Sequence, residues 1–295
     1  MNGFLNIDKP AGRTSHDVVA KVRRIFRTKR AGHAGTLDPD AVGVLVVAVG
    51  QATRLLPHLP TEPKEYVARI AFGVATDTED ASGTVTETGD ASLLTEAQLQ
   101  AVLPRFVGEI SQIPPMVSAV HHEGRRLYEL AREGVTVERQ PRTVTLFSLS
   151  AEDFTAGDRA EATLRVSCGG GTYIRTLCVD IGKALGLPAH MKSLIRNAVG
   201  AFRRESALSL EALEAQGENA LLAPEQALGL PLREINDGEA QRVLQGQAIS
   251  NDSPPETVPA ATEATVALIH RERLLALAHY TKGEVKPFKV FPPAE

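Results

Sequence analysis

The chain has 295 residues, 43% of them hydrophobic and 23% charged, with a formal net charge of −4 and a pI near 6.1. These values are ordinary for a soluble globular protein of about two domains. The chain contains no stretch of about 18 apolar residues, the length needed to cross a membrane. The two cysteines, Cys168 and Cys178, lack the spacing of a zinc site. The net charge excludes a uniformly basic nucleic-acid-binding protein, but phosphate binding depends on local charge.

The N-terminal residues predict a strand, a turn and a basic helix. Residues 3–7 have a strand pattern that the Pro- and Gly-containing turn at 9–12 is expected to end. Thr14 or Ser15 can cap the helix that follows. Residues 21–30 contain six cations and no acid. That surface is either simply solvated or faces phosphates, so RNA is a permitted partner.

A single carboxylate, Asp38, lies in the glycine-rich turn that comes next, Gly32-His33-Ala34-Gly35-Thr36-Leu37-Asp38-Pro39. Asp-Pro after glycine commonly starts a turn, which makes a structural role the simpler interpretation of Asp38 taken alone. A carboxylate on a basic, glycine-rich loop is also suited to chemistry on a polyanion. The residues themselves leave both interpretations open.

The middle of the chain predicts strands and helices that do not alternate regularly. Residues 42–49 are nearly all apolar and predict a strand buried on both faces. No GxGxxG or P-loop motif is present, so a nucleotide cofactor has no support. The order of elements favours an α+β fold with a mixed, mostly antiparallel central sheet flanked by helices. Further strands are expected at 66–72 and 162–167, an acidic turn at 76–90, and helices at 95–107, 126–133, 176–186 and 208–215.

A domain boundary is expected near residue 231, where a Gly- and Pro-containing segment ends an acidic helical stretch. This divides the chain into domains at 1–231 and 232–295. Short strands joined by turns predict a small β-barrel for the second domain. Its expected elements are a helix at 239–244, a Pro-rich loop at 251–263 and strands at 264–269, 273–279 and 286–291.

Tyr66 and Arg175 are two further candidates for chemistry. Tyr66 enters a strand and Arg175 follows a glycine run at a strand-to-helix junction; each is more often structural when considered alone. A guanidinium next to a carboxylate favours the ionised form of the carboxylate. Asp38 and Arg175 would therefore form a functional unit if the fold brings them together.

Five segments in this order resemble the motifs of the TruB-type pseudouridine synthases. They span nearly the whole chain, so chance agreement is improbable. The segments are Asn6-Ile7-Asp8-Lys9-Pro10; the Asp38 turn with Gly43; Lys64-Glu65-Tyr66 with Thr76-Asp77-Thr78; Gly171-Thr172-Tyr173-Ile174-Arg175-Thr176; and the closing Lys286-Pro287-Phe288-Lys289-Val290-Phe291.

The resemblance implies a role for each matching residue. Asp38 would be the catalytic carboxylate, Tyr66 would stack near the base and help to remove its C5 proton, and Arg175 would pair with Asp38. His33 would fill the gap left by a flipped nucleotide. Further substrate-binding positions implied by the same motifs are Lys9, Gly35, Tyr173 and Leu194.

The resemblance also implies the reaction and the partner. The enzyme would convert the uridine at position 55, in the T loop of tRNA, into pseudouridine after base flipping, with no metal or other cofactor. Residues 113–142 would grip the T loop, and 232–295 would form a PUA-like RNA-binding domain. We expect a cytoplasmic monomer that needs no protein partner and no membrane. The alternatives are a guide-RNA-dependent pseudouridine synthase and a non-catalytic RNA-binding or RNA-folding protein.

Three positions depart from the family pattern. Gly170 stands where the family often has a lysine, Val117 where an aromatic residue is frequent, and Asn197 where threonine is common. These departures concern individual RNA contacts rather than the class of reaction.

Overall fold

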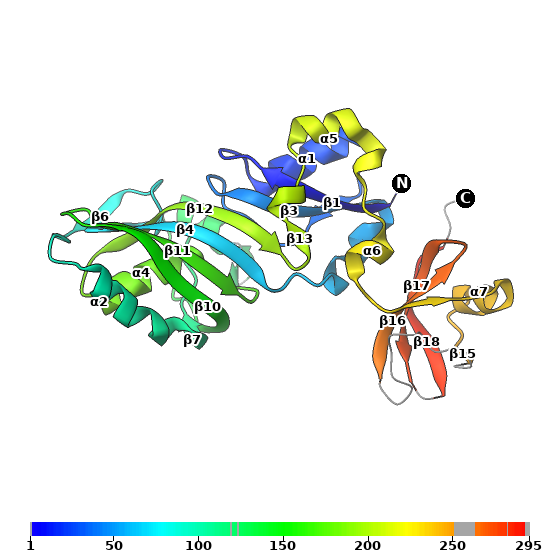
Figure 1. The fold of residues 1–295 in the computed structure, drawn as a ribbon. Coiled ribbons are helices and arrows are strands. Elements are labelled where there is room, and N and C mark those ends of the chain that lie inside the picture. The colour runs from blue at the N-terminus through cyan, green and yellow to red at the C-terminus, as the bar shows by residue number, and fades with distance from the viewer. Residues whose placement is uncertain (1, 119, 123, 251–262, 282, 293–295) are drawn as a thin grey trace.

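The computed structural model describes residues 2–118, 120–122, 124–250, 263–281 and 283–292. A large sheet with helices on its faces forms one lobe, and a smaller sheet near the C-terminus forms the other (Figure 1). The predicted α+β class, with a mixed and mostly antiparallel central sheet, is confirmed. The Pro-rich loop predicted at 251–263 lies almost entirely outside the described residues.

The large sheet has the order β1-β3-β12-β4-β11-β10-β7, with β2 paired to β3 and β13 paired to β12. All its pairs are antiparallel except β3 with β12. Its strands are β1 (Gly3–Lys9), β2 (Ala31–His33), β3 (Val42–Val49), β4 (Lys64–Phe72), β7 (Gly108–Gln112), β10 (Arg142–Thr155), β11 (Glu161–Cys168), β12 (Ala189–Val199) and β13 (Phe202–Arg203).

Strand β3 is buried on both faces, as its apolar sequence predicted. Side chains alternate across a strand, so Val44, Val46 and Ala48 join one apolar cluster while Leu45 and Val47 join another. Helices α1 (Ser15–Ile25) and α5 (Leu210–Gln216) cover the second face, and the 3₁₀ helix η1 (Gly50–His58) and helix α6 (Pro224–Leu228) cover the first (Figure 1). The middle of the sheet is therefore enclosed on both sides.

The helices begin where the sequence provides caps. Thr14 and Asp17 form a reciprocal capping box at the start of α1, which satisfies two backbone N–H groups. Helices α4 and α2 pack against the β4–β11–β12 part of the sheet. The helices are α1 (Ser15–Ile25), α2 (Glu96–Val102), α3 (Leu127–Arg132), α4 (Ile174–Ala184), α5 (Leu210–Gln216), α6 (Pro224–Leu228) and α7 (Asp237–Leu244), with 3₁₀ turns η1 (Gly50–His58), η2 (Leu103–Phe106), η3 (Arg204–Ser206) and η4 (Gly217–Ala220).

Several strands were predicted incompletely. Strand β1 continues to Lys9, two residues beyond the predicted end, because the backbone remains paired with Gly43 of β3. Strands β7, β10 and β12 were not predicted. Their sequences mix charged and apolar residues without clean alternation, yet β12 occupies the centre of the sheet, between β3 and β4.

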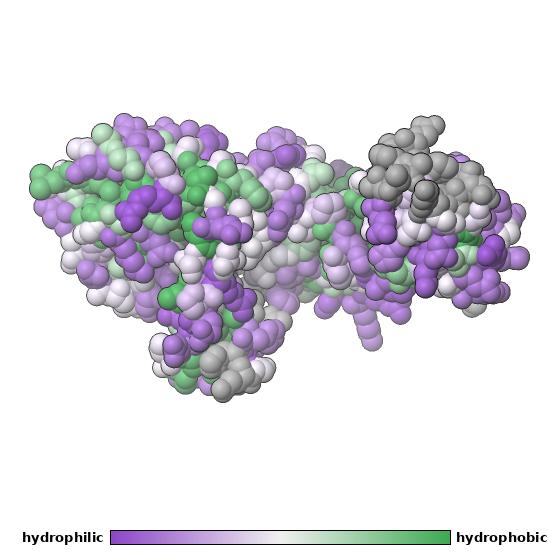
Figure 2. Space-filling model, turned by 90° about the horizontal axis from the view of Figure 1, so that it is seen from below, coloured by the Kyte–Doolittle hydropathy of each residue, from purple (hydrophilic) through white to green (hydrophobic). Residues whose placement is uncertain are grey.

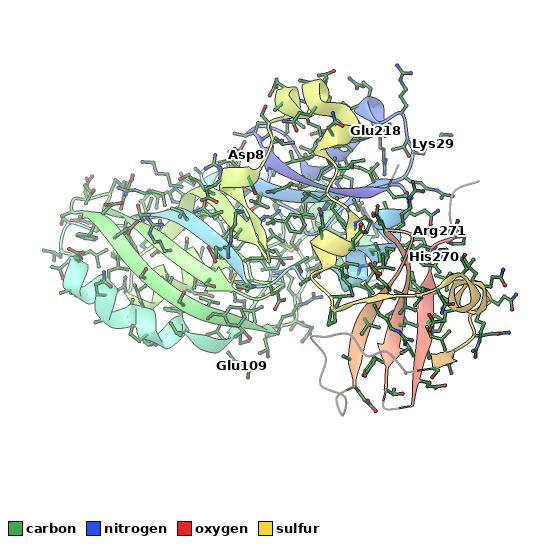
Figure 3. The ribbon with its side chains drawn as sticks, turned by 45° about the vertical axis from the view of Figure 1, so that its right-hand side comes forward. Asp8, Lys29, Glu109, Glu218, His270 and Arg271 are labelled. Carbon is green, nitrogen blue, oxygen red and sulfur yellow. The ribbon has the colours of Figure 1, made fainter. Side chains whose placement is uncertain are left out.

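The small sheet has the order β14-β16-β17-β18-β15 and fits a PUA-like half-barrel. Its apolar face packs on α7. At the β16–β17 turn, His270 and Arg271 both bind Asp237, the first residue of α7, and Figure 3 shows the two labelled side chains together at this end of the sheet. The strands are β14 (Leu232–Glu234), β15 (Ile249–Ser250), β16 (Ala264–His270), β17 (Arg273–Tyr280) and β18 (Glu284–Val290).

An apolar joint connects the two lobes. Ile269, Leu277 and Phe291 of the small lobe belong to the same buried cluster as Phe4 and Leu55 of the large lobe. Arg54 strengthens this joint, since its guanidinium donates to the Val290 carbonyl at 3.0 Å and lies 5.0 Å from the centroid of the Phe291 ring. The lobes are therefore packed together by side chains as well as joined by the chain.

Two hairpins project from this framework, β5 (Val74–Thr76) with β6 (Val85–Thr88) and β8 (His121–His122) with β9 (Arg125–Arg126). Figure 2 shows hydrophilic residues over much of the lower face, with smaller hydrophobic areas on the large lobe. Cys168 and Cys178 are free and buried. Within the described part of the chain, no helix has the length and apolar character needed to span a membrane.

Candidate active site

A cavity of about 850 Å³ lies where loops from both halves of the large sheet meet. This volume is large enough for a nucleotide, because small-molecule sites in proteins are usually about 300–1,000 Å³. The Asp38 turn, the start of β4, the 76–80 turn, the 113–142 segment and the start of α4 all contribute to its wall. Its lining includes His16, Gly35, Asp38, Lys64, Tyr66, Asp77, Thr78, Val117, Ser118, Tyr173, Arg175, Leu194 and Arg196.

The turn that carries Asp38 is held from behind by two side chains. Ser15 exchanges hydrogen bonds with the backbone of Leu37, accepting from its N–H at 2.9 Å and donating to its carbonyl at 3.1 Å. The ammonium of Lys9 donates to the carbonyls of Pro10, Arg13 and Pro39 at 2.6–2.9 Å. Both contacts fix the backbone directly around Asp38.

Asp38 and Arg175, 137 residues apart in the chain, meet in a two-pronged ion pair. The Arg175 Nη2 lies 3.0 Å from Asp38 Oδ1, and its Nε lies 2.9 Å from Oδ2. Such parallel hydrogen bonds fix the carboxylate plane as well as its position. The Arg175 side chain is 4% exposed while that of Asp38 is 30% exposed, so the carboxylate is open to the cavity and the guanidinium is not.

The remaining donors of Arg175 connect the ion pair to two other segments. Its Nη1 donates to the Thr78 carbonyl at 3.0 Å, and its Nη2 donates to the Val117 carbonyl at 2.9 Å. Asp80 lies 3.9 Å from the Arg175 Nε. Because Val117 contributes its backbone, the bond to Arg175 does not depend on the aromatic side chain that the family often has there.

Tyr66 lies at the start of β4 on the cavity wall, with 7% of its surface exposed. Burial raises the pKa of its hydroxyl, and the guanidinium of Arg196 acts in the opposite direction. Burial also raises the pKa of Tyr173 and lowers the pKa of the nearby Lys64. Burial in the cavity wall therefore shifts Tyr66, Tyr173 and Lys64 toward their neutral forms.

The structure gathers most of the predicted site residues at the cavity but places two of them elsewhere. Asp38, Gly35, Tyr66, Tyr173, Arg175 and Leu194 all line it.

Lys9 is the first exception, and the expectation that it lines the pocket is revised. Its side chain is fully buried behind the Asp38 turn, where it supports the backbone instead. His33 is the second exception, because its ring lies at the end of β2, 5.5 Å from the ring of His16, which does line the cavity. His33 is thus adjacent to the site rather than part of its wall.

The sequence did not single out Asp80, Lys64 or Arg196 as site residues. Asp80 was part of a predicted acidic turn, yet it organises that turn by accepting from Thr78 Oγ1 at 2.7 Å and Ser82 Oγ at 2.6 Å. The spacing Thr78-x-Asp80-x-Ser82 was an available signal, since Asp commonly bonds the residue two positions on. Arg196 was assigned no role from the sequence.

Gly170, the departure in the glycine run, has a structural reason. Its N–H donates to Glu62 Oε1 at 2.6 Å, and a Cβ at this position would lie 2.8 Å from the same oxygen. A lysine here would require Glu62 to move. Among the residues that the structure describes, no group of three or more His, Cys, Asp or Glu side chains is placed to hold a metal ion.

Comparison with known families identifies two matches that together cover residues 23–233. Residues 23–174 match the family described as "TruB family pseudouridylate synthase (N terminal domain)". Residues 175–233 match "tRNA pseudouridylate synthase B C-terminal domain".

Relatives of similar length carry the name tRNA pseudouridine synthase B. The chain is 50% identical over 249 residues to the protein from Symbiobacterium thermophilum, covering 84% of this chain and 83% of the relative. It is 42% identical over 305 residues to the protein from Oceanobacillus iheyensis, covering 99% and 98%.

Solved structures with a similar fold include chains from two macromolecular complexes. The structure titled "Structure of H/ACA RNP bound to a substrate RNA containing 2'-deoxyuridine" has a TM-score of 0.70 at 28% identity. That titled "Crystal Structure of a Cbf5-Nop10-Gar1 Complex" has a TM-score of 0.69 at 30% identity. Each match covers 99% of this chain and 85% of the solved chain.

Proposed function

The chain belongs to the TruB family of pseudouridylate synthases, and from this premise we propose that it isomerises the uridine at position 55, in the T loop of tRNA. At the level that the family establishes, it is an isomerase that forms pseudouridine in tRNA. The position, the mechanism and the residue roles that follow are our proposal.

The observation that carries the proposal is the Asp38–Arg175 pair on the cavity wall, with Tyr66 on the same wall. The target uridine would leave the folded T loop and enter this cavity, at a cost of a few kcal/mol for unstacking. Gly35, Tyr173 and Leu194 would contact the base or ribose there, and His33 beside the mouth would fill the vacated stack.

In the proposed reaction, the bond from the ribose C1′ to the base N1 breaks, the base rotates, and a bond from C1′ to C5 forms. The C5 proton is then lost and N1 gains a proton, so the overall reaction is an isomerisation. Asp38 would be the group that permits bond cleavage, acting at C1′, at C6 or as a base. Tyr66 would help to remove the C5 proton.

Arg175 would keep the Asp38 carboxylate in one orientation through its two hydrogen bonds. The carboxylate thus needs no reorganisation after the base enters, which is how positioned groups lower an activation barrier. The proposal needs no chemistry beyond that of the chain's own side chains.

For the rest of the chain, we propose that residues 113–142 grip the T loop, with residues 1–231 as the catalytic domain and 232–295 as an RNA-binding domain. Val117 and Ser118 support the first assignment, because they are part of the cavity wall and belong to this segment. A monomer acting without a protein partner is the assembly that we propose.

The test is a reaction with bare tRNA transcript and purified protein. We expect one new pseudouridine at position 55, and none when that uridine is replaced by cytidine. The second candidate, a guide-RNA-dependent enzyme, is favoured by the similarity to ribonucleoprotein subunits. It would require added guide RNA for any product. A purely RNA-binding protein would give no product under either condition.

A further inference from the structure

We infer that Arg196 is a positioning residue of this active site, which fixes the backbone before Asp38 and places a buried positive charge beside Tyr66. The inference rests on the proposed function, because that function gives Asp38 and Tyr66 their roles. Arg196 itself belongs to strand β12 and lies at the inner end of the cavity wall.

The sheet register places the side chain of Arg196 next to that of Tyr66. The two residues are directly paired across the antiparallel strands β12 and β4. Such partners project from the same face of a sheet, with their Cβ atoms about 5 Å apart. The register shifts immediately after Arg196, between Arg196 and Ala198, and irregularities of this kind often re-aim side chains beside active sites.

On its other side Arg196 pairs with Gly43 of β3, in the parallel pair of the large sheet. Gly43 has φ +107°, and a Cβ there would lie 2.2 Å from the Arg196 carbonyl oxygen. Only glycine permits so close an approach. Gly43 therefore allows β3 and the Asp38 turn to lie directly against Arg196.

The guanidinium of Arg196 binds three backbone carbonyls. Its Nε donates to Val44 at 2.7 Å, its Nη1 to Thr36 at 3.1 Å and its Nη2 to Gly35 at 3.2 Å. The planar fork of arginine fixes several acceptors at once. Two of these carbonyls precede Asp38 by two and three residues, so Arg196 determines where the turn enters the cavity.

The charge of Arg196 is held differently from that of Arg175. The residue is 1% exposed, and within the described residues no carboxylate forms an ion pair with it, whereas Arg175 has Asp38 and Asp80. A buried cation held by carbonyl dipoles and by the Tyr66 hydroxyl, without an ion pair, is costly to desolvate. It gains from any negative charge that develops nearby, on the Tyr66 oxygen or on the bound base.

The first experiment measures the ionisation of Tyr66 directly. The chain has no tryptophan and only four tyrosines, so near-ultraviolet absorbance of tyrosinate can be followed during an alkaline titration. Subtracting the titration of Tyr66→Phe isolates Tyr66. We expect Arg196→Gln to move this ionisation upward by at least about one pH unit, equivalent to a tenfold change in equilibrium, and Arg196→Lys to move it less.

The second experiment measures single-turnover pseudouridine formation at saturating tRNA. We expect Arg196→Gln to react about a hundredfold more slowly, since a displacement of about 1 Å in a catalytic group can have this effect. Arg196→Lys should recover part of the rate because it restores the charge. The affinity for tRNA should change less than about threefold, since only 1% of the residue is exposed.

Arg233→Gln is the matched control. Arg233 is also a buried arginine on a strand, but it lies in the small sheet and pairs with Glu239. Its replacement should lower stability without shifting the Tyr66 titration or the single-turnover rate. Equal slowing by both substitutions would mean that general loss of stability explains the effect, and would overturn the inference.

The inference is also overturned if folded Arg196→Gln reacts within threefold of the wild-type rate with an unchanged titration. If the glutamine variant does not fold, the same measurements are made on Arg196→Met, which also lacks the charge and the donors. Asp38→Asn separates this failure from that of the proposed function. An inactive Asp38→Asn with an unaffected Arg196 variant leaves the proposed function standing.

Discussion

Arg175 of the large lobe and Arg233 of the small lobe have equally buried side chains, both 4% exposed, and each donates hydrogen bonds to one partly exposed carboxylate. The partner of Arg233, Glu239, uses its other oxygen to accept from the Asn236 N–H in the capping box of α7. The partner of Arg175, Asp38, instead opens on a cavity.

The comparison shows that burial and pairing do not by themselves identify a functional arginine. Both ion pairs satisfy a buried arginine donor, although Arg175 and Asp38 are 137 residues apart and Arg233 and Glu239 only six. The difference is the space beside the carboxylate and the other groups that face that space. The small lobe presents a buried pair with a structural task, and the large lobe presents one that can meet a substrate.

Asp38→Asn should have the largest effect. We expect pseudouridine formation to fall by at least about a thousandfold, which corresponds to about 4 kcal/mol of transition-state stabilisation, because the amide cannot replace a carboxylate in bond cleavage. A single-turnover assay with mapped product measures this. Glu239→Gln in the small lobe should keep the wild-type rate. A fully active Asp38→Asn variant would remove Asp38 from the mechanism.

Tyr66→Phe should have the next largest effect. Loss of the hydroxyl should slow the reaction by about a hundredfold or more, the scale of one proton-transfer group, while thermal stability changes little because the ring remains. The matched variant is Tyr280→Phe, whose 1% exposed hydroxyl has no hydrogen-bond partner among the described residues. That change should leave both rate and stability nearly unaltered. Similar slowing in the two variants would contradict a special role for Tyr66.

The lowered pKa of Lys9 predicts that the free energy of unfolding depends on pH, an effect that an exposed lysine of the small lobe should not produce. Burial lowers the pKa of Lys9 to about 8 from 10.5. Between these values the unfolded chain binds more protons, so the contribution of Lys9 to the free energy of unfolding rises with pH, by about 1–3 kcal/mol. Denaturant titrations at several pH values should show that the free energy of unfolding of wild type increases relative to that of Lys9→Met across this pH range. Lys286→Met, at an exposed site of β18, should show the same pH dependence of the free energy of unfolding as wild type.

Lys286→Gln should have the smallest effect, on binding alone. If the small lobe contacts RNA phosphates, the affinity for tRNA should fall a few-fold and the slope of log affinity against log salt should decrease by about one. Filter binding at several salt concentrations measures both quantities. The rate on saturating tRNA should be unchanged. An unchanged salt slope would show that Lys286 makes no phosphate contact.

The structural features that the sequence predicted correctly are those whose signals lie in neighbouring residues of the chain. The cap at Thr14 and the doubly buried strand at 42–49 follow from residues adjacent in the chain, and both are confirmed. The family motifs directed attention to Asp38, Tyr66 and Arg175, which the fold gathers at one cavity. Their meeting depends on how the strands pair, which no local pattern contains.

Arg196 and Lys9 show why the rest could not be predicted. An arginine in a mixed strand and a lysine before a proline both resemble solvated residues, yet they are 1% and 0% exposed. Each charge is bound by backbone carbonyls, some of them from distant segments, such as Pro39 for Lys9 and Thr36 for Arg196. Only the folded chain brings the distant carbonyls into place, so the sequence near either residue does not predict them.

The apolar joint between the lobes sets the distance between the surfaces of the two lobes. A binder with two fixed sites gains affinity only from a ligand whose own two sites have the same spacing. If both lobes touch one RNA, discrimination can come from the distance between its contact points, with no base being read. Ile269, Leu277 and Phe291 pack against the large lobe. Replacing one of them by a larger or smaller apolar residue would therefore change that distance while leaving every RNA-facing side chain intact.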